Sequence, residues 1–233
     1  LGPVATRSNL IQIYEKLINQ DAKNHLQAIR AAGQLYALML GRNNHEAWEP
    51  LEKPLKDLDR IQGAPSYLLM LYLLVQKDKH ELTNDHLESI VKLLARFFVR
   101  RNLTDTPPTR DLNRLFLTVI EKISKLRADA IPQSIEQQLV AVSASDDAFQ
   151  HKLEGPIYEE NSGVTRFILC ALAEQAMTKE TWVDLWRFEN KQFMWTIEHI
   201  FPQGDNIPQS WINMIAGGDE KKAKEIQQTH VHK

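Results

Sequence analysis

The chain has 233 residues, of which 43% are hydrophobic and 25% are charged, and its formal net charge is −2. This composition is typical of a folded protein with one large or two smaller domains. The nearly neutral charge excludes the overall basic character of a non-specific nucleic-acid binder, so any DNA contact has to be local. No apolar run approaches the ~20 residues that span a bilayer, and we expect no membrane role.

The single cysteine, Cys170, lies in the apolar run 167–172. One cysteine cannot form an internal disulfide, and a free cysteine in apolar surroundings is most often a small core residue. A chain without disulfides suits a reducing compartment, so we expect a cytoplasmic protein.

Apolar residues recur at helical spacing through most of residues 8–187. Ser8 is expected to cap the first helix, and a second amphipathic run is expected to end at Gly41. Further helices are expected to open at Pro65 and after Thr83. The second of these should bury an apolar face made of Leu87, Ile90, Val91, Leu94 and Phe98.

Pro107 and Pro108 are expected to break the chain before another helix, so this part predicts a helical bundle of antiparallel neighbours. The most turn-rich stretch is 143–163, where we expect a domain boundary or a loop. A helix is expected from Val164 to Met177, followed by a short helix capped by Thr178. We therefore expect a helical domain at 1–160 and a helical lead-in with a small module at 161–233.

A strand is expected next, because Phe193, Trp195 and Ile197 alternate with polar residues in a run rich in β-formers. Pro202 has no amide hydrogen to give to a ladder, so this strand should stop near Phe201 and be followed by a turn.

Residues 196–203 read Thr-Ile-Glu-His-Ile-Phe-Pro-Gln, an acid–His–aliphatic–x–Pro pattern. Phosphodiester cleavage needs a base for the attacking water and positive charge near the phosphoryl oxygens. An imidazole titrates near neutral pH, so His199 is a candidate general base. Glu198 is a candidate ligand for Mg²⁺ or Mn²⁺, with Asp205 and His232 as further candidate ligands. Five other histidines are scattered among polar residues and are expected to be solvated: His25, His45, His80, His86 and His151.

The stretch from Trp195 to Gln203, followed by Trp211, resembles the HNH (ββα-metal) nucleases, and among them the HNH domain of GmrSD-type modification-dependent restriction enzymes. By that resemblance His199 matches the general base and Glu198 the metal-binding acid. The resemblance implies a mainly α fold, a helical bundle followed by a small partial ββα-metal module. The chain ends at Lys233, about where the family's Gly-Asn-Leu segment would start, so we expect this polypeptide alone to cleave DNA poorly or not at all.

The same resemblance implies Mg²⁺-dependent cleavage of double-stranded DNA, directed at modified or foreign DNA in restriction or phage defence. Helical segments at 97–103 and 112–116 are similar, more weakly, to the middle region of GmrSD-type proteins. The partner implied by the family is an amino-terminal ParB-like nucleotide-hydrolysing domain or subunit, whose Asp-Gly-Gln-Gln-Arg signature is absent from this sequence.

The densest basic cluster contains Arg100, Arg101, Arg110 and Arg114, which are candidates for contacts to DNA phosphates. The alternative is structural, because arginines near a helix end interact favourably with the helix dipole and pair with neighbouring acids.

Two other interpretations remain open. His199 can be a buried, hydrogen-bonded residue of a structural strand. The whole chain can also be a non-catalytic helical protein-interaction or regulatory module, which an exposed apolar helix face would favour.

Overall fold

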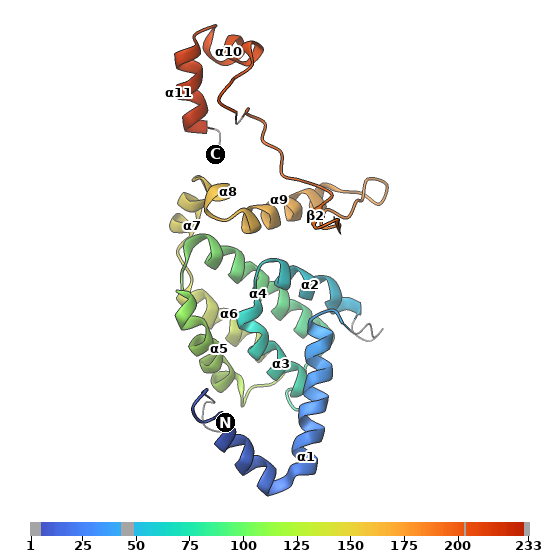
Figure 1. Ribbon diagram of the computed structural model, residues 1–233. Helices are drawn as coiled ribbons and strands as arrows, with labels where there is room; N and C mark the ends of the chain where they lie inside the picture. The colour runs from blue at the N-terminus through green and yellow to red at the C-terminus, as the bar shows by residue number, and fades with distance from the viewer. Residues whose placement is uncertain (1–5, 43–48, 203, 231–233) are drawn as a thin grey trace. The chain divides into compact units, whose positions relative to one another are not determined.

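The computed structural model describes residues 6–42, 49–202 and 204–230. These residues are mainly helical, as expected, with eleven α-helices, one short 3-10 helix and one two-stranded hairpin (Figure 1). None of these helices is both long enough and apolar enough to cross a membrane.

The chain divides into two compact units. The first comprises Leu1–Phe98 and Asp105–Ser143, and the second comprises Val99–Thr104 and Ala144–Lys233. The division after Ser143 falls at the start of the turn-rich stretch, whereas the sequence placed the domain boundary between residues 160 and 161. That stretch is not a simple loop, because it contains two short helices.

The first unit contains most of the long helices. α3 contacts α1 and α5, and α5 also contacts α6. α3 is apolar on nearly every side, and it buries Leu69, Met70 and Leu73 completely. The bounds are α1 (Leu10–Met39), α2 (Glu49–Arg60), the 3-10 helix η2 (Ala64–Ser66), α3 (Tyr67–Val75), α4 (Asn84–Thr104), α5 (Thr109–Ile123) and α6 (Ala130–Val142). The last part of α4, Val99–Thr104, belongs to the second unit.

α1 is two helical runs joined at a kink. Asp21 has extended backbone angles, φ −162° and ψ 82°, and its carboxylate accepts a hydrogen bond from the Asn24 backbone amide at 3.1 Å. Asp21 thereby caps the second run in the manner of a helix N-cap. The first run begins after Asn9, not after the expected cap Ser8, and the second ends before Gly41, whose positive φ of 66° fits the expected stop.

α4 begins as the sequence predicted. The Thr83 hydroxyl accepts from the His86 amide at 3.2 Å, and the His86 ring accepts from the Thr83 amide at 3.1 Å, which completes a capping box. The predicted apolar face is confirmed, since all five of its residues are 0–1% exposed. Phe98 of this face stacks on Phe116 of α5 with ring centroids 6.2 Å apart.

The expectation that His80 and His86 are solvated is wrong. His80 is 1% exposed, and its ring bonds the Leu126 carbonyl at 2.8 Å and the Tyr72 hydroxyl at 2.9 Å. The ring of His86 bonds the Asp129 carboxylate at 2.8 Å. Both histidines therefore bind the connection between α5 and α6. The sequence around each histidine is polar and gives no sign of these distant partners. His25 is half-buried, His151 is exposed, and His45 lies outside the described residues.

The second unit contains short elements. α8 packs on α9, and α10 packs on α11. The hairpin pairs Phe188 with Phe193 and Glu189 with Gln192. The bounds are α7 (Asp146–Leu153), α8 (Ile157–Glu160), α9 (Ser162–Ala176), β1 (Phe188–Glu189), β2 (Gln192–Phe193), α10 (Gln209–Ala216) and α11 (Glu220–His230).

Two sequence predictions in this unit are wrong. The expected strand covers only Gln192–Phe193, and residues 194–202 form neither strand nor helix. The alternating pattern supplies β-formers but not a partner strand for the later residues, and a strand needs a ladder to persist. The short helix expected after Thr178 is a turn, closed by a bond of 2.8 Å from the Thr178 amide to the Thr181 hydroxyl.

Candidate functional site

Glu198 and His199 lie in the segment 194–202, which follows β2 directly. Glu198 is exposed, and its Oε1 accepts a hydrogen bond from the Thr196 hydroxyl at 2.9 Å. His199 is half-buried. The carboxylate is therefore accessible from solvent, while the imidazole is packed on one side.

Tyr158 of α8 packs against the imidazole of His199. The two ring centroids are 4.7 Å apart and the ring planes meet at 82°, an edge-to-face arrangement. Tyr158 was absent from the sequence-based site. It precedes His199 by 41 positions in a stretch that appeared to be a loop, so no local pattern could have linked the two residues.

The chain after His199 is attached to the last two helices. The Gln227 side-chain amide donates to the carbonyl oxygens of Pro202 at 2.7 Å and Gly204 at 2.9 Å. Phe201 contacts Trp211 of α10, with ring centroids 5.2 Å apart. Trp211, which the family resemblance includes, therefore has a packing role here.

The chain before Glu198 is held by Arg166 of α9. This arginine is 8% exposed, and its guanidinium donates to the Leu185 carbonyl at 2.6 Å. The guanidinium carbon lies 3.7 Å from the centre of the Phe193 ring and 5.4 Å from that of Trp186. Within the described parts of the chain, Arg166 Nε is buried without a hydrogen-bond partner. The aromatic rings therefore provide most of what stabilises this buried cation.

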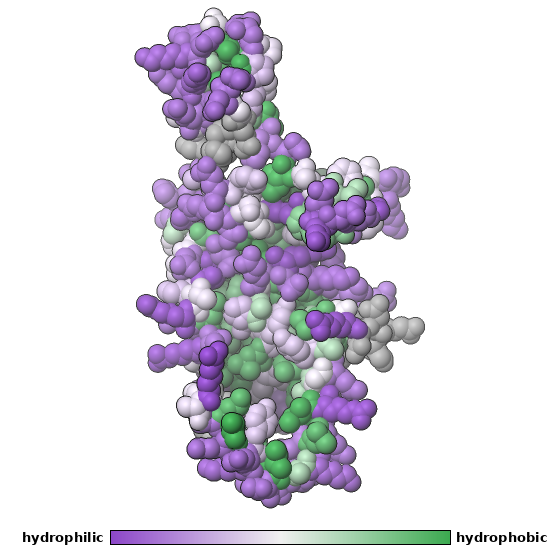
Figure 2. All heavy atoms as spheres, viewed as in Figure 1, coloured by the Kyte–Doolittle hydropathy of each residue, from purple (hydrophilic) through white to green (hydrophobic). Residues whose placement is uncertain are grey.

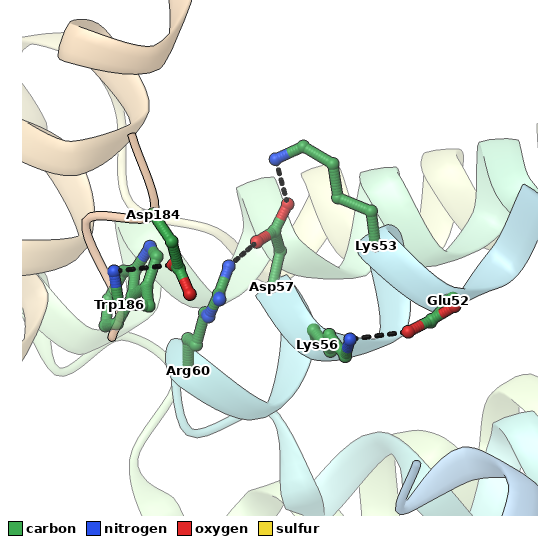
Figure 3. A network of polar contacts seen from close by, with 7 residues as sticks. All are labelled: Glu52, Lys53, Lys56, Asp57, Arg60, Asp184 and Trp186. Atoms are coloured by element: carbon green, nitrogen blue, oxygen red, sulfur yellow. Dashed lines mark hydrogen bonds and ion pairs between the residues drawn. The ribbon is translucent and has the colours of Figure 1, made fainter. Parts of the chain in front are cut away.

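The hairpin has further fixed points. The Trp186 amide donates to the Asp184 carboxylate at 2.9 Å, a contact drawn in Figure 3. The Met194 amide donates to the Arg187 carbonyl at 2.9 Å and so extends the hairpin by one bond. The segment 194–202, which has no regular secondary structure, is therefore attached to the hairpin at its first residue.

Two of the candidate metal ligands, Glu198 and Asp205, lie within the described residues. Among residues 6–42, 49–202 and 204–230, no group of three or more His, Cys, Asp or Glu side chains is placed to hold a metal ion. Asp205 is exposed in a bend after Pro202. His232 lies outside the described residues. Glu198 is thus the acid of the motif that a hydrated cation can reach directly.

The four candidate arginines are divided between the units. Arg100 and Arg101 belong to the second unit, whereas Arg110 and Arg114 lie on α5 in the first. Arg100 donates to the Ala144 carbonyl at 2.9 Å and to the Asp146 carboxylate at 2.6 Å.

Arg100 also lies 4.7 Å from the centre of the Phe149 ring, and Arg101 donates to the Asn102 side chain at 3.1 Å. Arg100 therefore has the structural role that the sequence left open as an alternative. Arg110 and Arg114 are exposed on α5, where Arg110 lies 3.9 Å from the Asp111 carboxylate. Their contact with DNA stays a prediction.

A cavity of about 230 Å³ lies in the first unit, between the end of α1 and α2. Its charged lining is paired within the unit. Lys56 binds Glu52 at 2.5 Å, and Arg60, which also lines the cavity, binds Asp57 at 3.0 Å (Figure 3). Lys53 approaches the same Asp57 carboxylate at 3.4 Å. Asp59, the fourth charged residue of the lining, accepts a hydrogen bond from the Tyr67 hydroxyl at 2.9 Å.

Comparison of the chain with models of protein families, with curated proteins and with solved structures gave no match. The residues at 195–202 and 204–211 and their geometry are therefore what bears on the function of this chain.

Proposed function

We propose that this chain is part of a Mg²⁺-dependent HNH-type DNA endonuclease of a restriction or phage-defence system. The single observation that carries the proposal is the adjacent pair of Glu198 and His199. The carboxylate is exposed to solvent, and the imidazole contacts an aromatic ring from another element edge to face. Their order and the following Pro202 support the resemblance described above.

In the proposed reaction, His199 takes the proton from the water that attacks the phosphodiester bond. The imidazole has to point at the attacking water before the reaction begins, because a small displacement of a reacting group lowers the reaction rate strongly. The edge-to-face contact with Tyr158 supports such an orientation.

Glu198 would hold Mg²⁺ or Mn²⁺, which supplies positive charge for the phosphoryl oxygens when bound. The donor set fits such a cation in part. Magnesium commonly keeps several waters and binds through one or two carboxylates, and Glu198 provides one exposed carboxylate. Asp205, which is exposed in the bend after Pro202, is the proposed second donor.

The finer architecture is also a proposal. The helices of the first unit would form a bundle, and the β1–β2 hairpin with the segment 194–202 and α10 would be a partial ββα-metal module. The implied partners are double-stranded DNA, modified or foreign, and a ParB-like nucleotide-hydrolysing domain or subunit, in the cytoplasm.

Manganese binding tests this proposal without relying on cleavage. Mn²⁺ added to the isotope-labelled chain should broaden the NMR signals of Glu198 and His199 before others, because the paramagnetic effect falls steeply with distance. Glu198→Gln should remove this selective broadening. Glu180→Gln, a matched exposed carboxylate of the same unit, should not. Equal broadening in the wild type and in Glu198→Gln would contradict the proposal.

The alternative function, a non-catalytic interaction module, is favoured by one observation. α1 exposes several large apolar side chains, and hydrophobic atoms appear in green at the surface over α1, low in the view of Figure 2. Large apolar side chains gathered on an exposed surface can mark an interaction site. The most exposed members are Ile11 (71%), Leu26 (70%), Ile18 (52%) and Ile29 (52%). Ile11→Glu combined with Ile18→Glu should abolish partner binding or self-association on gel filtration if this alternative is correct.

A further inference from the structure

We infer that Tyr158 is a positioning residue for His199, a role that rests on the proposed nuclease function. The imidazole and the phenol ring meet edge to face with centroids 4.7 Å apart. Tyr158 would act through His199 and not on the substrate, by restricting the directions that the imidazole can take.

The segment that carries His199 has no regular secondary structure that would restrict the side chain. Residues 195–202 form neither strand nor helix, and the residues on both sides of His199 are exposed, with Ile200 at 93%. A side chain on such a segment keeps its rotamers unless another element restricts them. Tyr158, from α8, supplies an aromatic surface in direct contact with the imidazole.

Tyr158 is held in place by the contacts of α8 with its neighbours. α8 packs on α9, and the residue that follows it, Asn161, caps α9 by accepting from the Val164 amide at 3.1 Å. Glu160 of α8 binds the Lys152 ammonium of α7 at 2.9 Å. The single turn of α8 is thus attached on both sides, and Tyr158 is half-buried. A short helix attached in this way can hold a ring in a fixed place.

The segment that carries His199 is attached to other elements at both of its ends. Arg166 fixes the hairpin before it, and Gln227 fixes the Pro202 carbonyl after it. With both ends attached, the backbone around His199 has a defined path. Tyr158 contacts the imidazole itself and restricts its rotation, at low entropic cost because an aromatic residue has only two side-chain torsions.

Variants of Tyr158 distinguish the contribution of its aromatic ring from that of its hydroxyl group. Tyr158→Phe keeps the edge-to-face contact and should retain the rate of DNA nicking within about twofold. Tyr158→Ala should lower the turnover rate about tenfold or more. Its KM should change little, because the variant loses the orientation of His199 and not the binding of DNA. Tyr158→Leu, which keeps bulk without an aromatic ring, guards against a folding defect in the alanine variant. Tyr14→Ala, on the exposed side of α1, is the matched control.

The measurement has two parts on the same full chain. The ring-proton NMR shifts of His199, assigned from the spectrum of His199→Gln, report the ring contact without any metal or DNA. They should be preserved in Tyr158→Phe and should move in Tyr158→Ala and Tyr158→Leu, as the ring current is lost. Plasmid nicking with Mn²⁺ then reports the consequence for catalysis.

The outcomes are distinguishable. Unchanged His199 shifts in folded Tyr158→Ala overturn the contact and the inference. Moved shifts with unchanged nicking overturn the positioning role alone. If His199→Ala nicks as fast as the wild type, the nuclease function fails and the positioning role fails with it, while the NMR shifts still report whether the rings touch. Moved shifts together with a tenfold loss in Tyr158→Ala, restored in Tyr158→Phe, support the inference.

Discussion

The side-chain amide of Gln227 lies 2.7 Å from the carbonyl oxygen of Pro202, and this bond joins the last helix to the end of the acid–His–aliphatic–x–Pro motif. The same amide reaches Gly204 at 2.9 Å. One residue of α11 therefore satisfies two carbonyl groups of an irregular segment, which is how a chain without regular structure keeps a defined path.

Removal of this amide should loosen the motif locally. Gln227→Ala leaves two carbonyls without their donor, and each lost bond costs about 1 kcal/mol. Hydrogen exchange of the amides at 204–207 should become several-fold faster, with a small change in the overall melting temperature. Gln228→Ala, the exposed neighbour on the same helix, is the control and should leave the exchange rates unchanged. Equal exchange in both variants would refute the attachment.

The capping box of α4 should be measurable as stability of the first unit. Thr83→Ala removes the hydroxyl that accepts from the His86 amide, and loss of such a cap costs about 1 kcal/mol. Thr83→Ser keeps the oxygen and should lose much less. Urea unfolding followed by circular dichroism gives both values. The account of α4 is wrong if alanine and serine variants unfold at the same urea concentration.

Tyr67 should make the first unit sensitive to alkaline pH. Burial, first, and the hydrogen bond to Asp59 at 2.9 Å, second, raise the pKa of Tyr67 above its ordinary value. The ionised phenol is therefore disfavoured in the folded state. The corresponding stability is complete below the unfolded pKa of about 10 and is lost as pH rises above it towards the raised folded pKa.

Tyr67→Phe has no ionisable group, so its urea midpoint should fall less steeply than that of the wild type from pH 9.5 to 11. Tyr14→Phe, changed at an exposed tyrosine of α1, should retain the wild-type slope. A Tyr67→Phe variant whose stability falls as steeply as the wild type would contradict this assignment.

The stability of the β1–β2 hairpin should depend on the planar shape of the Arg166 side chain as well as on its charge. Its guanidinium stacks on Phe193 at 3.7 Å, and a desolvated contact of this kind contributes about 2 kcal/mol. Arg166→Lys keeps the charge but not the planar group, so it should not restore what Arg166→Ala loses. The Met194 amide, which closes the hairpin on Arg187, should exchange faster in both variants. Wild-type exchange in Arg166→Lys would show that charge alone is sufficient.

Local signals in the sequence predicted the helices well. Thr83 has the capping chemistry and Gly41 has the positive φ that their positions indicated, because caps and stops depend on one or two neighbouring residues. The apolar periodicity of α4 likewise predicted which residues are buried. The division after Ser143 falls within the turn-rich stretch 143–163, and the domain boundary expected between residues 160 and 161 stays a prediction.

Long-range relationships were not predictable in this way. The alternation from Phe193 onward suggested a strand, but a strand also requires a partner, and the sequence does not say which segment would pair with residues 194–200. The contact between Tyr158 and His199 and the burial of His80 depend on chain segments separated by tens of residues. The candidate pair of Glu198 and His199 came from its motif, whereas its supporting residues came from the structure.

The most direct test of the central claim is nicking of supercoiled plasmid DNA by the wild-type chain, His199→Ala and Glu198→Gln, with Mg²⁺ or Mn²⁺ present and with EDTA. His151→Ala, at an exposed histidine of α7, serves as the control. We predict slow metal-dependent nicking that persists in His151→Ala and falls at least a hundredfold in both site variants, since removal of a general base typically costs 10² to 10⁴ in rate. Nicking at the wild-type rate in His199→Ala and Glu198→Gln would contradict the account.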